Sequence, residues 1–405
     1  MIDKLRVRNF RCLRDVEVPL GPLNFLIGPN NAGKSSFLQA VETLSYATSV
    51  PNVELAFRPR DEPGKGRDGR GHDLNRILTN GDSLASLSYQ CVASWNSPEG
   101  VQQVADYSLA IGKHPPQSGA NQGEAVPELE TIEVKGPEGA RVCQYRRTRD
   151  ASEGWHSPGD LEKTDVPRES TVLHRYADRQ ALRELKRCLT ATPVYQLVPA
   201  QIARPCQVWP ADGIKANGFG LASYLARFSD QHPDRLASIV EALGRLVPRL
   251  ERVTFPNVSA QEKTILFHEK GGVRFYASEA SDGLLLFLAY LAIAYAHGDV
   301  GIVLVEEPET GVHARSLQDI VRILRAVARG ELGLPPVQVI ATSHSPYLLD
   351  WCGKEEVIFF LRDEQGEVRV KPLAEVPEID ERIEDFESLG AFVFSVGESA
   401  CKSPS

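Results

Sequence analysis

The sequence predicts an α/β fold in which a sheet carries helices on its faces, together with an antiparallel β-lobe and a helical insertion. An apolar run at residues 23–27 leads into a glycine-rich loop and then into a helical pattern at 36–44. Residues 84–95, 101–112 and 129–147 look like the strands of an antiparallel lobe, with a polar break at 114–126. Nearer the C-terminus, helical and strand patterns follow one another at 282–296, 300–305, 313–329 and 337–341. This alternation around one loop predicts helices packed on a sheet.

The elements fall into three expected domains: 1–150, 151–250 and 251–405. In the first, two short strands within residues 1–20 precede the glycine-rich loop, and the antiparallel lobe follows it. The second is mainly helical, with helical spacing at 176–190 and 218–250 but without the sustained heptads of a coiled-coil arm. The third returns to strands and helices and closes with a hairpin-like run at 356–373.

Composition indicates a globular protein and argues against several classes. The 405 residues carry a formal net charge of −9, which disfavours a protein that coats nucleic acid over its whole surface. The longest apolar run, Gly283–Ala296, is shorter than the roughly 20 residues that span a bilayer, and no secretory signal begins the chain. Seven scattered cysteines without a C-x-x-C pair indicate reduced thiols. We therefore expect a cytoplasmic protein with no membrane segment.

Residues 28–35 fill every fixed position of the phosphate-binding pattern G-x-x-x-x-G-K-[ST]. The glycines let successive backbone N–H groups turn inward around phosphate oxygens, and the following helix adds the positive end of its dipole. Lys34 would reach the β- and γ-phosphates, and the Ser35 hydroxyl would help to hold Mg²⁺. The predicted nucleotide-binding residues here are Gly28, Pro29, Asn30, Asn31, Ala32, Gly33, Lys34, Ser35 and Ser36.

Two carboxylates, Glu306 and Glu307, end the apolar strand pattern that begins near residue 300. Beside a phosphate loop, Glu306 would bind Mg²⁺ together with Ser35, and Glu307 would polarise the water that attacks the γ-phosphate. Taken alone, such a pair is often an ordinary exposed strand end. His344 follows the next apolar strand pattern, where it can hydrogen-bond the γ-phosphate or the attacking water, although a lone histidine is more often structural.

Ser281, Asp282 and Gly283 precede the long apolar helical pattern. The hydroxyl and backbone amides at such a helix start can receive a phosphate. Ser281 or Asp282 can equally act as a simple N-cap, with Gly283 as a turn residue. The two roles are compatible, so Ser281 and Gly283 join the nucleotide-binding candidates.

In this order, the motifs resemble an ABC-type ATPase of the RecF/SMC/OLD group, and in particular the stand-alone AAA family ATPases of bacterial defence and repair systems. The resemblance covers about residues 1–50 and 270–350 and involves several independent motifs. It implies a P-loop NTPase of ABC type that binds ATP and Mg²⁺ and hydrolyses ATP to ADP and phosphate. The motifs are GPNNAGKSS at 28–36, SDGLLLFLAYLAIA at 281–294, IVLVEEPETGVH at 302–313 and ATSHSP at 341–346.

The resemblance also implies a homodimer in which two heads meet head to tail around two ATP molecules. Ser281 and Gly283 would then touch the γ-phosphate bound to the other subunit, and residues 308–311 would match the segment that crosses the dimer interface. His344 matches the switch histidine. Arg11 corresponds to a basic residue near the nucleotide in relatives, or is an ordinary surface arginine.

The chain departs from the family pattern at three points. Glu306 stands where aspartate is usual, which keeps the charge but moves it by one methylene. The segment around Ser281 lacks the Leu-Ser-Gly-Gly sequence that the family prefers. This departure argues against tight closure of a dimer. The glutamine that contacts Mg²⁺ in relatives has no assigned match, and Gln90 is a guess for it.

Two functions stay open at this level. OLD-type nucleases carry a C-terminal Toprim domain, whereas only about 60 residues follow His344 here, without a D-x-D pair. The acidic run at 380–387 favours a solvated helix face. We therefore expect no nuclease in this chain, and first an ATP-driven switch that controls a separate effector protein in anti-phage defence.

The alternative is a RecF-like DNA-binding ATPase that acts in repair or replication. DNA would need a basic surface, and two arginine-rich stretches could supply it, although such stretches are more often ordinary solvated loops. A membrane-transporter ATPase is disfavoured by the insertion and the TSHSP motif. The basic residues concerned are Arg58, Arg60, Lys65, Arg67, Arg70, Arg141, Arg146, Arg147 and Arg149.

Overall fold

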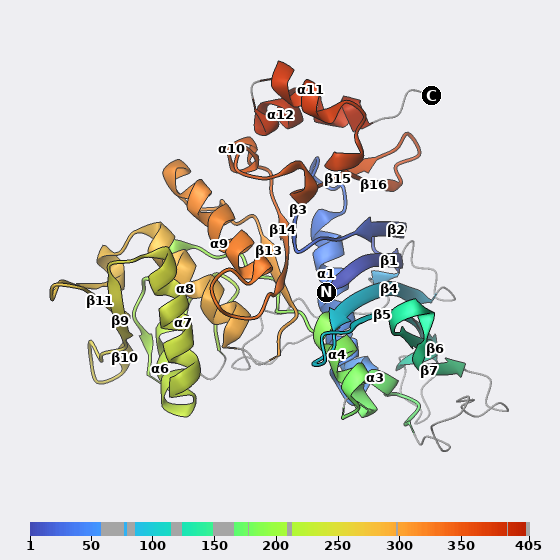
Figure 1. Cartoon of the computed structure of the whole chain (residues 1–405), viewed down its shortest axis with the longest axis horizontal. Coiled ribbons are helices and arrows are strands. Elements are labelled where there is room, and N and C mark those ends of the chain that lie inside the picture. The colour runs from blue at the N-terminus through green and yellow to red at the C-terminus, as the bar shows by residue number, and fades with distance from the viewer. Residues whose placement is uncertain are drawn as a thin grey trace.

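The computed structural model describes residues 1–57, 77–78, 86–114, 124–148, 166–176, 178–208, 213–296, 299–386 and 388–401. A mainly parallel sheet lies in the middle of the molecule, with the antiparallel lobe on one side and a group of helices on the other (Figure 1). This architecture confirms the predicted α/β fold with an antiparallel lobe.

The central sheet has the strand order β13-β14-β3-β15-β16. The first four strands are parallel to their neighbours, and β16 adds an antiparallel edge. Because β14 lies between β13 and β3, the loops that follow these three strands meet at one edge of the sheet. The strands are β3 (Leu23–Ile27), β13 (Ile302–Glu306), β14 (Gln338–Thr342), β15 (Val357–Arg362) and β16 (Val368–Pro372).

Each central strand divides its apolar side chains between two hydrophobic cores, because successive residues of a strand point to opposite faces. In β3, Leu26 belongs to one core, while Phe25 and Ile27 belong to the other. In β13, Leu304 and Val305 are divided in the same way. The sheet is therefore buried on both faces, as the near-continuous apolar runs of its strands predict.

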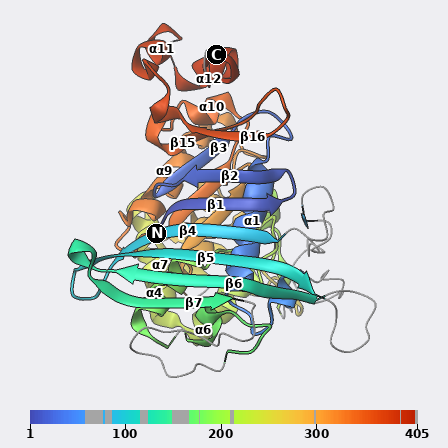
Figure 2. The same ribbon diagram turned by 90° about the vertical axis from the view of Figure 1, so that its right-hand side faces the viewer.

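The first core lies between the central sheet and a six-stranded antiparallel sheet, with α1 (Lys34–Ala47) packed between them. Figure 2 shows this outer sheet face on, in the order β2-β1-β4-β5-β6-β7. The N-terminal strand pair and the predicted lobe thus form one sheet. Its strands are β1 (Ile2–Phe10), β2 (Leu13–Pro19), β4 (Leu87–Asn96), β5 (Gln102–His114), β6 (Glu124–Lys135) and β7 (Arg141–Thr148).

The second core lies on the opposite face, where α8 (Asp282–Tyr295) and α9 (Leu317–Arg329) pack. Every residue of α8 from Gly283 to Ala294 is buried, which explains its continuous apolar pattern. Within the described ranges, no helix is long and apolar enough to cross a membrane. Farther out lie α6 (Leu221–Gln231), α7 (Pro233–Leu246), β8 (Cys206–Gln207), β9 (Leu250–Thr254), β10 (Glu262–Lys263), β11 (Leu266–Glu269) and β12 (Arg274–Tyr276).

The region expected to be a helical insertion contains helices in its described parts, together with the short strand β8 and one extended stretch beside the central sheet. Pro233 begins α7 directly after α6, so the predicted helical region at 218–250 is two helices. Between the helices, the chain from Ala191 to Tyr195 runs beside β13 and forms parallel bridges with it. This short stretch extends the central sheet. The shorter helices of the region are α3 (Val172–Arg175), α4 (Gln180–Leu189) and α5 (Pro199–Ile202).

The C-terminal helices lie together at the top of Figure 1. The acidic run predicted as a solvated helix face forms α11, with Asp380, Glu381 and Glu384 exposed. These helices are α10 (Pro346–Leu349), α11 (Ile379–Asp385) and α12 (Leu389–Cys401). Short 3₁₀ turns connect other elements: η1 (Val53–Ala56), η3 (Pro137–Gly139), η4 (Ala277–Glu279), η5 (Ala314–Ser316), η6 (Lys354–Glu356) and η7 (Leu373–Glu375).

Candidate functional site

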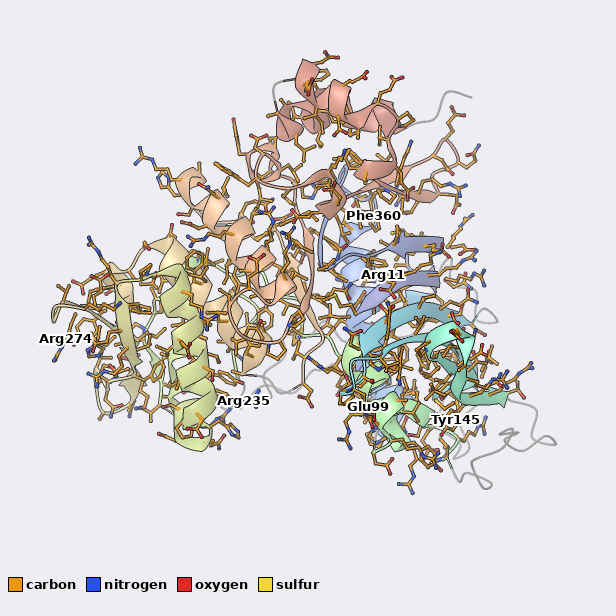
Figure 3. All side chains as sticks on the ribbon, in the orientation of Figure 1. Arg11, Glu99, Tyr145, Arg235, Arg274 and Phe360 are labelled. Carbon is orange, nitrogen blue, oxygen red and sulfur yellow. The ribbon has the colours of Figure 1, made fainter. Side chains whose placement is uncertain are left out.

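The phosphate loop joins β3 to α1 and is shaped by its two glycines. Gly28 and Gly33 have φ angles of 138° and 100°, which glycine adopts without strain. A Cβ at Gly28 would lie 1.9 Å from the backbone oxygen of Phe360 in β15, so the loop packs directly against the neighbouring strand. Figure 3 labels Phe360 and Arg11 on the side of the molecule that carries α1. The required strand, loop and helix are therefore present in the predicted order.

Lys34 is held inside this loop. Its Nζ donates hydrogen bonds to the backbone oxygens of Gly28 at 2.7 Å and Pro29 at 2.8 Å. Burial lowers the pKa of Lys34 to about 8, and the negative charge of Glu307 opposes that shift. A bound phosphate would take the place of these two neutral backbone acceptors. The ammonium group would then donate its hydrogen bonds to charged phosphate oxygens, and such bonds are stronger.

We expect ATP affinity to fall as the pH rises through 8. Phosphate oxygens favour the ammonium form of Lys34, so above pH 8 binding must take up a proton. Between pH 7.5 and 9 the dissociation constant should rise about tenfold. Calorimetry in buffers of different ionisation enthalpy would detect the proton uptake. In a Lys34→Arg control, which stays charged, this pH dependence should vanish. An equal affinity of the native protein at both pH values would contradict the role of Lys34.

The phosphate loop and the first carboxylate meet directly. The Ser35 hydroxyl donates a hydrogen bond to Oε1 of Glu306 at 2.5 Å, between residues 271 positions apart in the sequence. A hydroxyl and a carboxylate oxygen in contact are the hard oxygen donors that Mg²⁺ prefers. The residues present therefore fit the predicted magnesium site, and glutamate supplies the same donor atom type as aspartate.

Glu307 has an unusual backbone conformation. Its φ angle of 44° lies in the left-handed region, where a residue with a side chain is strained, and such strain is typical of functional sites. The conformation is held by the Glu307 N–H, which donates to the backbone oxygen of Thr342 at 3.1 Å. Its Oε2 accepts hydrogen bonds from Nε2 of Gln196 and Oγ1 of Thr310, each at 3.2 Å. The carboxylate is thus fixed through Oε2, while Oε1 accepts no hydrogen bond from the part of the chain that the structure describes.

His344 lies beside that oxygen. Its Nε2 is 3.9 Å from Oε1 of Glu307. Burial, and then the positive charge of Lys34, lower the pKa of His344, while Glu307 and two further carboxylates oppose the shift. The imidazole is therefore neutral near pH 7. The structure brings Lys34, Ser35, Glu306, Glu307 and His344 to one edge of the central sheet, as their positions at strand ends predict.

Two residues of this site were missed by the sequence analysis. Gln196, which fixes Glu307, follows the stretch that runs beside β13. Arg362 at the end of β15 donates through Nε and Nη2 to the backbone oxygen of Asn31, at 2.9 and 2.8 Å, and so anchors the tip of the phosphate loop. The alternation of apolar residues around Tyr195 indicated a strand that could have placed Gln196 near the site. The pattern around Arg362 indicated only a hairpin.

Arg11 and Ser36 belong to the edge of this site. Arg11, in the turn between β1 and β2, donates from Nη1 to Oε1 of Gln39 in α1. The neighbouring Cys12 Sγ lies 3.5 Å from the Ser36 hydroxyl. The turn thus packs on the first turns of α1, close to the phosphate loop, and a nucleotide contact of Arg11 stays a prediction. Gln90 lies on the exposed face of β4, while its neighbours in the strand face the core.

Ser281 and Gly283 lie at the start of α8, and the contacts described above do not include them. Ser281 is the N-cap of α8 and accepts a hydrogen bond from the Leu284 N–H at 3.3 Å. Both residues line a separate cavity of about 390 Å³. A Cβ at Gly283 would lie 3.2 Å from Asp319 of α9. The helices that carry the two predicted halves of the nucleotide site, α1 and α8, belong to different cores and pack on opposite faces of the central sheet.

The proposed DNA surface is only partly described. Arg141 and Arg146 are exposed on β7, the edge strand of the outer sheet, and Nε of Arg141 lies 3.7 Å from Oε1 of Glu133. Arg147 also belongs to β7, and the remaining basic residues lie outside the described residues: Arg58, Arg60, Lys65, Arg67, Arg70 and Arg149.

Two family matches cover the ends of the site. Residues 1–58 match the family described as "AAA ATPase domain". Residues 212–350 match the family described as "AAA domain, putative AbiEii toxin, Type IV TA system". The first contains the phosphate loop, and the second contains Ser281, both carboxylates and His344.

Curated relatives match short parts of the chain. One segment of 61 residues is 52% identical to the OLD nuclease of Thermus scotoductus, covering 15% of this chain and 11% of that protein. A segment of 55 residues is 40% identical to the DNA replication and repair protein RecF of Proteus mirabilis, covering 13% and 15%. RecF of Shigella flexneri is 27% identical over 119 residues, covering 24% and 33%. The chain spans about a tenth to a third of these relatives.

Among solved structures, the SMC head domain from Thermotoga maritima has a TM-score of 0.41 at 11% identity, covering 92% of this chain and 98% of that one. A SmcHead bound to the C-winged helix domain of ScpA has a TM-score of 0.44 at the same identity, covering 91% and 97%. The family matches and the curated relatives are thus AAA ATPase domains, the OLD nuclease and RecF, in line with the resemblance that the motifs carry.

Proposed function

We propose that this chain is an ABC-type switch that binds ATP and Mg²⁺, hydrolyses ATP to ADP and phosphate, and closes and opens a head-to-tail homodimer as it does so. The observation that carries the proposal is the 2.5 Å contact between Ser35 of the phosphate loop and Glu306 of β13. This contact joins a hydroxyl to a carboxylate, and the neighbouring Lys34 and Glu307 add an ammonium group and a second carboxylate, which are the groups that phosphoryl transfer uses.

In the proposed reaction, Lys34 exchanges its two backbone oxygens for phosphate oxygens. Glu307, held by Gln196 and Thr310, orients the attacking water and accepts its proton. The neutral His344 hydrogen-bonds the γ-phosphate or that water. Bound Mg²⁺, held by Ser35 and Glu306, would neutralise charge on the phosphate oxygens.

The proposed dimer rests on where Ser281 lies. Ser281 caps α8, which packs on the face of the central sheet opposite α1, the helix that follows the phosphate loop. A second chain, turned head to tail, can present its Ser281 and Gly283 to the nucleotide of the first chain. The same hydroxyl can then make both contacts. Its oxygen accepts the capping hydrogen bond from the Leu284 N–H, and its O–H donates to the phosphate.

Ser281→Arg is expected to leave ATP binding by the monomer intact and to block ATP-dependent dimerisation. The longer side chain fills the space that the other subunit's γ-phosphate needs, and overpacking of this kind weakens association by about tenfold or more. Light scattering after size exclusion, with and without ATP, measures the dimer, and Ser238→Arg on the exposed face of α7 is the matched control. An unchanged ATP-dependent dimer would refute the trans arrangement.

We further propose that the dimer controls a separate effector protein in bacterial anti-phage defence. The match of residues 212–350 to a family whose description includes a toxin of a Type IV toxin–antitoxin system supports this, as does the segment similar to the OLD nuclease. Purification of the chain from its native host at low and high salt tests the proposal. A partner protein that remains bound at high salt is the expected result.

A RecF-like role in DNA repair or replication is the second candidate, and the segments similar to RecF favour it. The same purification separates the two candidates, because binding through phosphate contacts weakens steeply with salt. Nucleic acid that travels with the chain at low salt and leaves at high salt, with no partner protein at either salt, would favour this second function.

A further inference from the structure

The chemistry proposed above assigns no role to Glu309, although this carboxylate contacts the loop that carries His344. Its Oε1 accepts three hydrogen bonds, from the Ser343 hydroxyl at 2.8 Å, the His344 N–H at 2.9 Å and the Ser345 N–H at 3.2 Å. One carboxylate oxygen therefore holds three consecutive residues after β14. Glu309 itself follows Glu307 by two residues, so it ties the loop after β13 to the loop after β14.

The His344 ring depends on this backbone anchor. Within the described residues the imidazole makes no hydrogen bond of its own, the Glu307 carboxylate lies 3.9 Å from its Nε2, and about a third of its side chain is exposed. A ring without side-chain partners takes its position from the backbone that carries it. The carboxylate of Glu309 is the side chain that contacts all three residues of that backbone, where the Ser343 N–H also donates to the backbone oxygen of Leu26 at 3.1 Å.

The second oxygen of Glu309 has an unusual environment. Oε2 is buried without a hydrogen-bond partner among the described residues, and so is the hydroxyl of Tyr290 in α8. Burial, and then the charge of Glu309, raise the pKa of Tyr290, so the two groups sense each other. A carboxylate kept for structure alone would have both oxygens satisfied. Local rules of this kind are broken mostly at functional sites.

We propose that Glu309 is a positioning residue that holds residues 343–345 so that the His344 imidazole stays beside Glu307. The resemblance to the family implied that residues 308–311 cross the dimer interface. Here the Glu309 side chain turns inward to its own chain, so it acts within one subunit. The inference rests on the proposed ATPase function, because it concerns the rate of that reaction.

Steady-state phosphate release by the full chain, measured over a range of ATP concentrations, tests the proposal. Glu309→Ala should lower kcat by roughly 10²-fold, because the loop and its histidine lose their anchor. The KM for ATP should change by less than about threefold, since Lys34 and the phosphate loop are untouched. Glu309→Gln, which keeps one acceptor oxygen for the three donors, should restore kcat to within about tenfold of the native value.

A double-mutant cycle with His344→Ala separates positioning from general damage. If Glu309 acts through His344, adding Glu309→Ala to His344→Ala should lower kcat by no more than about twofold further. Glu356→Ala is the matched control, because it removes a buried carboxylate that pairs with Arg325 at 2.7 Å. Its effect on kcat, if any, should be the same with and without His344.

The outcomes are distinct. No turnover by the native chain would refute the proposed function itself. Native turnover with an unchanged kcat in Glu309→Ala, or full additivity with His344→Ala, would overturn the positioning role alone. If Glu309→Ala does not fold, Glu309→Gln in the two backgrounds decides: a loss of kcat that disappears without His344 supports the role, and an additive loss overturns it.

Discussion

Lys34→Ala is expected to abolish measurable ATP binding. The ammonium group supplies charge-assisted hydrogen bonds to phosphate oxygens, and losing two such bonds at about 1.5–3 kcal/mol each weakens binding by about 10²-fold or more. Fluorescent-nucleotide titration measures the loss. A variant that binds ATP within about threefold of the native affinity would show that the loop is not the nucleotide site.

The fold should survive this change. Burial lowers the pKa of Lys34 to about 8 in the folded protein, below the usual value for lysine. Near pH 7 the charged form is therefore less favourable in the folded state than in the unfolded chain. Removing the group relieves that penalty, and the melting temperature should stay the same or rise. Lys186→Ala is the matched control, because burial also lowers the pKa of Lys186 in α4 but that residue lies away from the site.

Glu307→Gln is expected to keep ATP binding and to stop turnover. The amide oxygen can still accept hydrogen bonds from Gln196 and Thr310, but a neutral amide cannot take the proton of the attacking water. Loss of a general base lowers kcat by about 10²–10⁴-fold. ATP should then accumulate in the closed dimer, which size exclusion with light scattering would detect.

Glu331→Gln, an exposed carboxylate after α9, is the control for the loss of one negative charge and should hydrolyse ATP normally. Hydrolysis at the native rate by Glu307→Gln would remove Glu307 from the role of base. A variant that neither binds ATP nor dimerises would instead point to a structural role for this residue, whose left-handed φ angle depends on the contacts of the loop.

Local sequence patterns predicted most of the candidate site residues at the edge of the central sheet. The phosphate loop is a contiguous motif, and its glycine angles follow from steric freedom at two positions. Glu306, Glu307 and His344 each end an apolar run, and in a parallel sheet such ends meet. Their convergence therefore required only the correct assignment of strands.

The contacts that hold these residues in place could not be predicted in the same way. Gln196 reaches Glu307 across 111 positions, and Arg362 reaches Asn31 across 331. Each depends on which strands become neighbours, and a single sequence carries no signal for strand order. The stretch before Gln196 does show apolar alternation, but it is too short and too close to helical patterns to be recognised as a strand from sequence.

The position of β3 in the central sheet has a consequence for how the chain acquires its structure. β3 bonds to β14 and β15, where Phe25 pairs with Ala341 and Val357. A ribosome delivers the N-terminal residues first, yet β3 has no partner in this sheet until most of the chain has been made. We therefore expect the phosphate loop to acquire its neighbouring strands only late in synthesis, so a nascent chain should not bind nucleotide before β14 and β15 have been made.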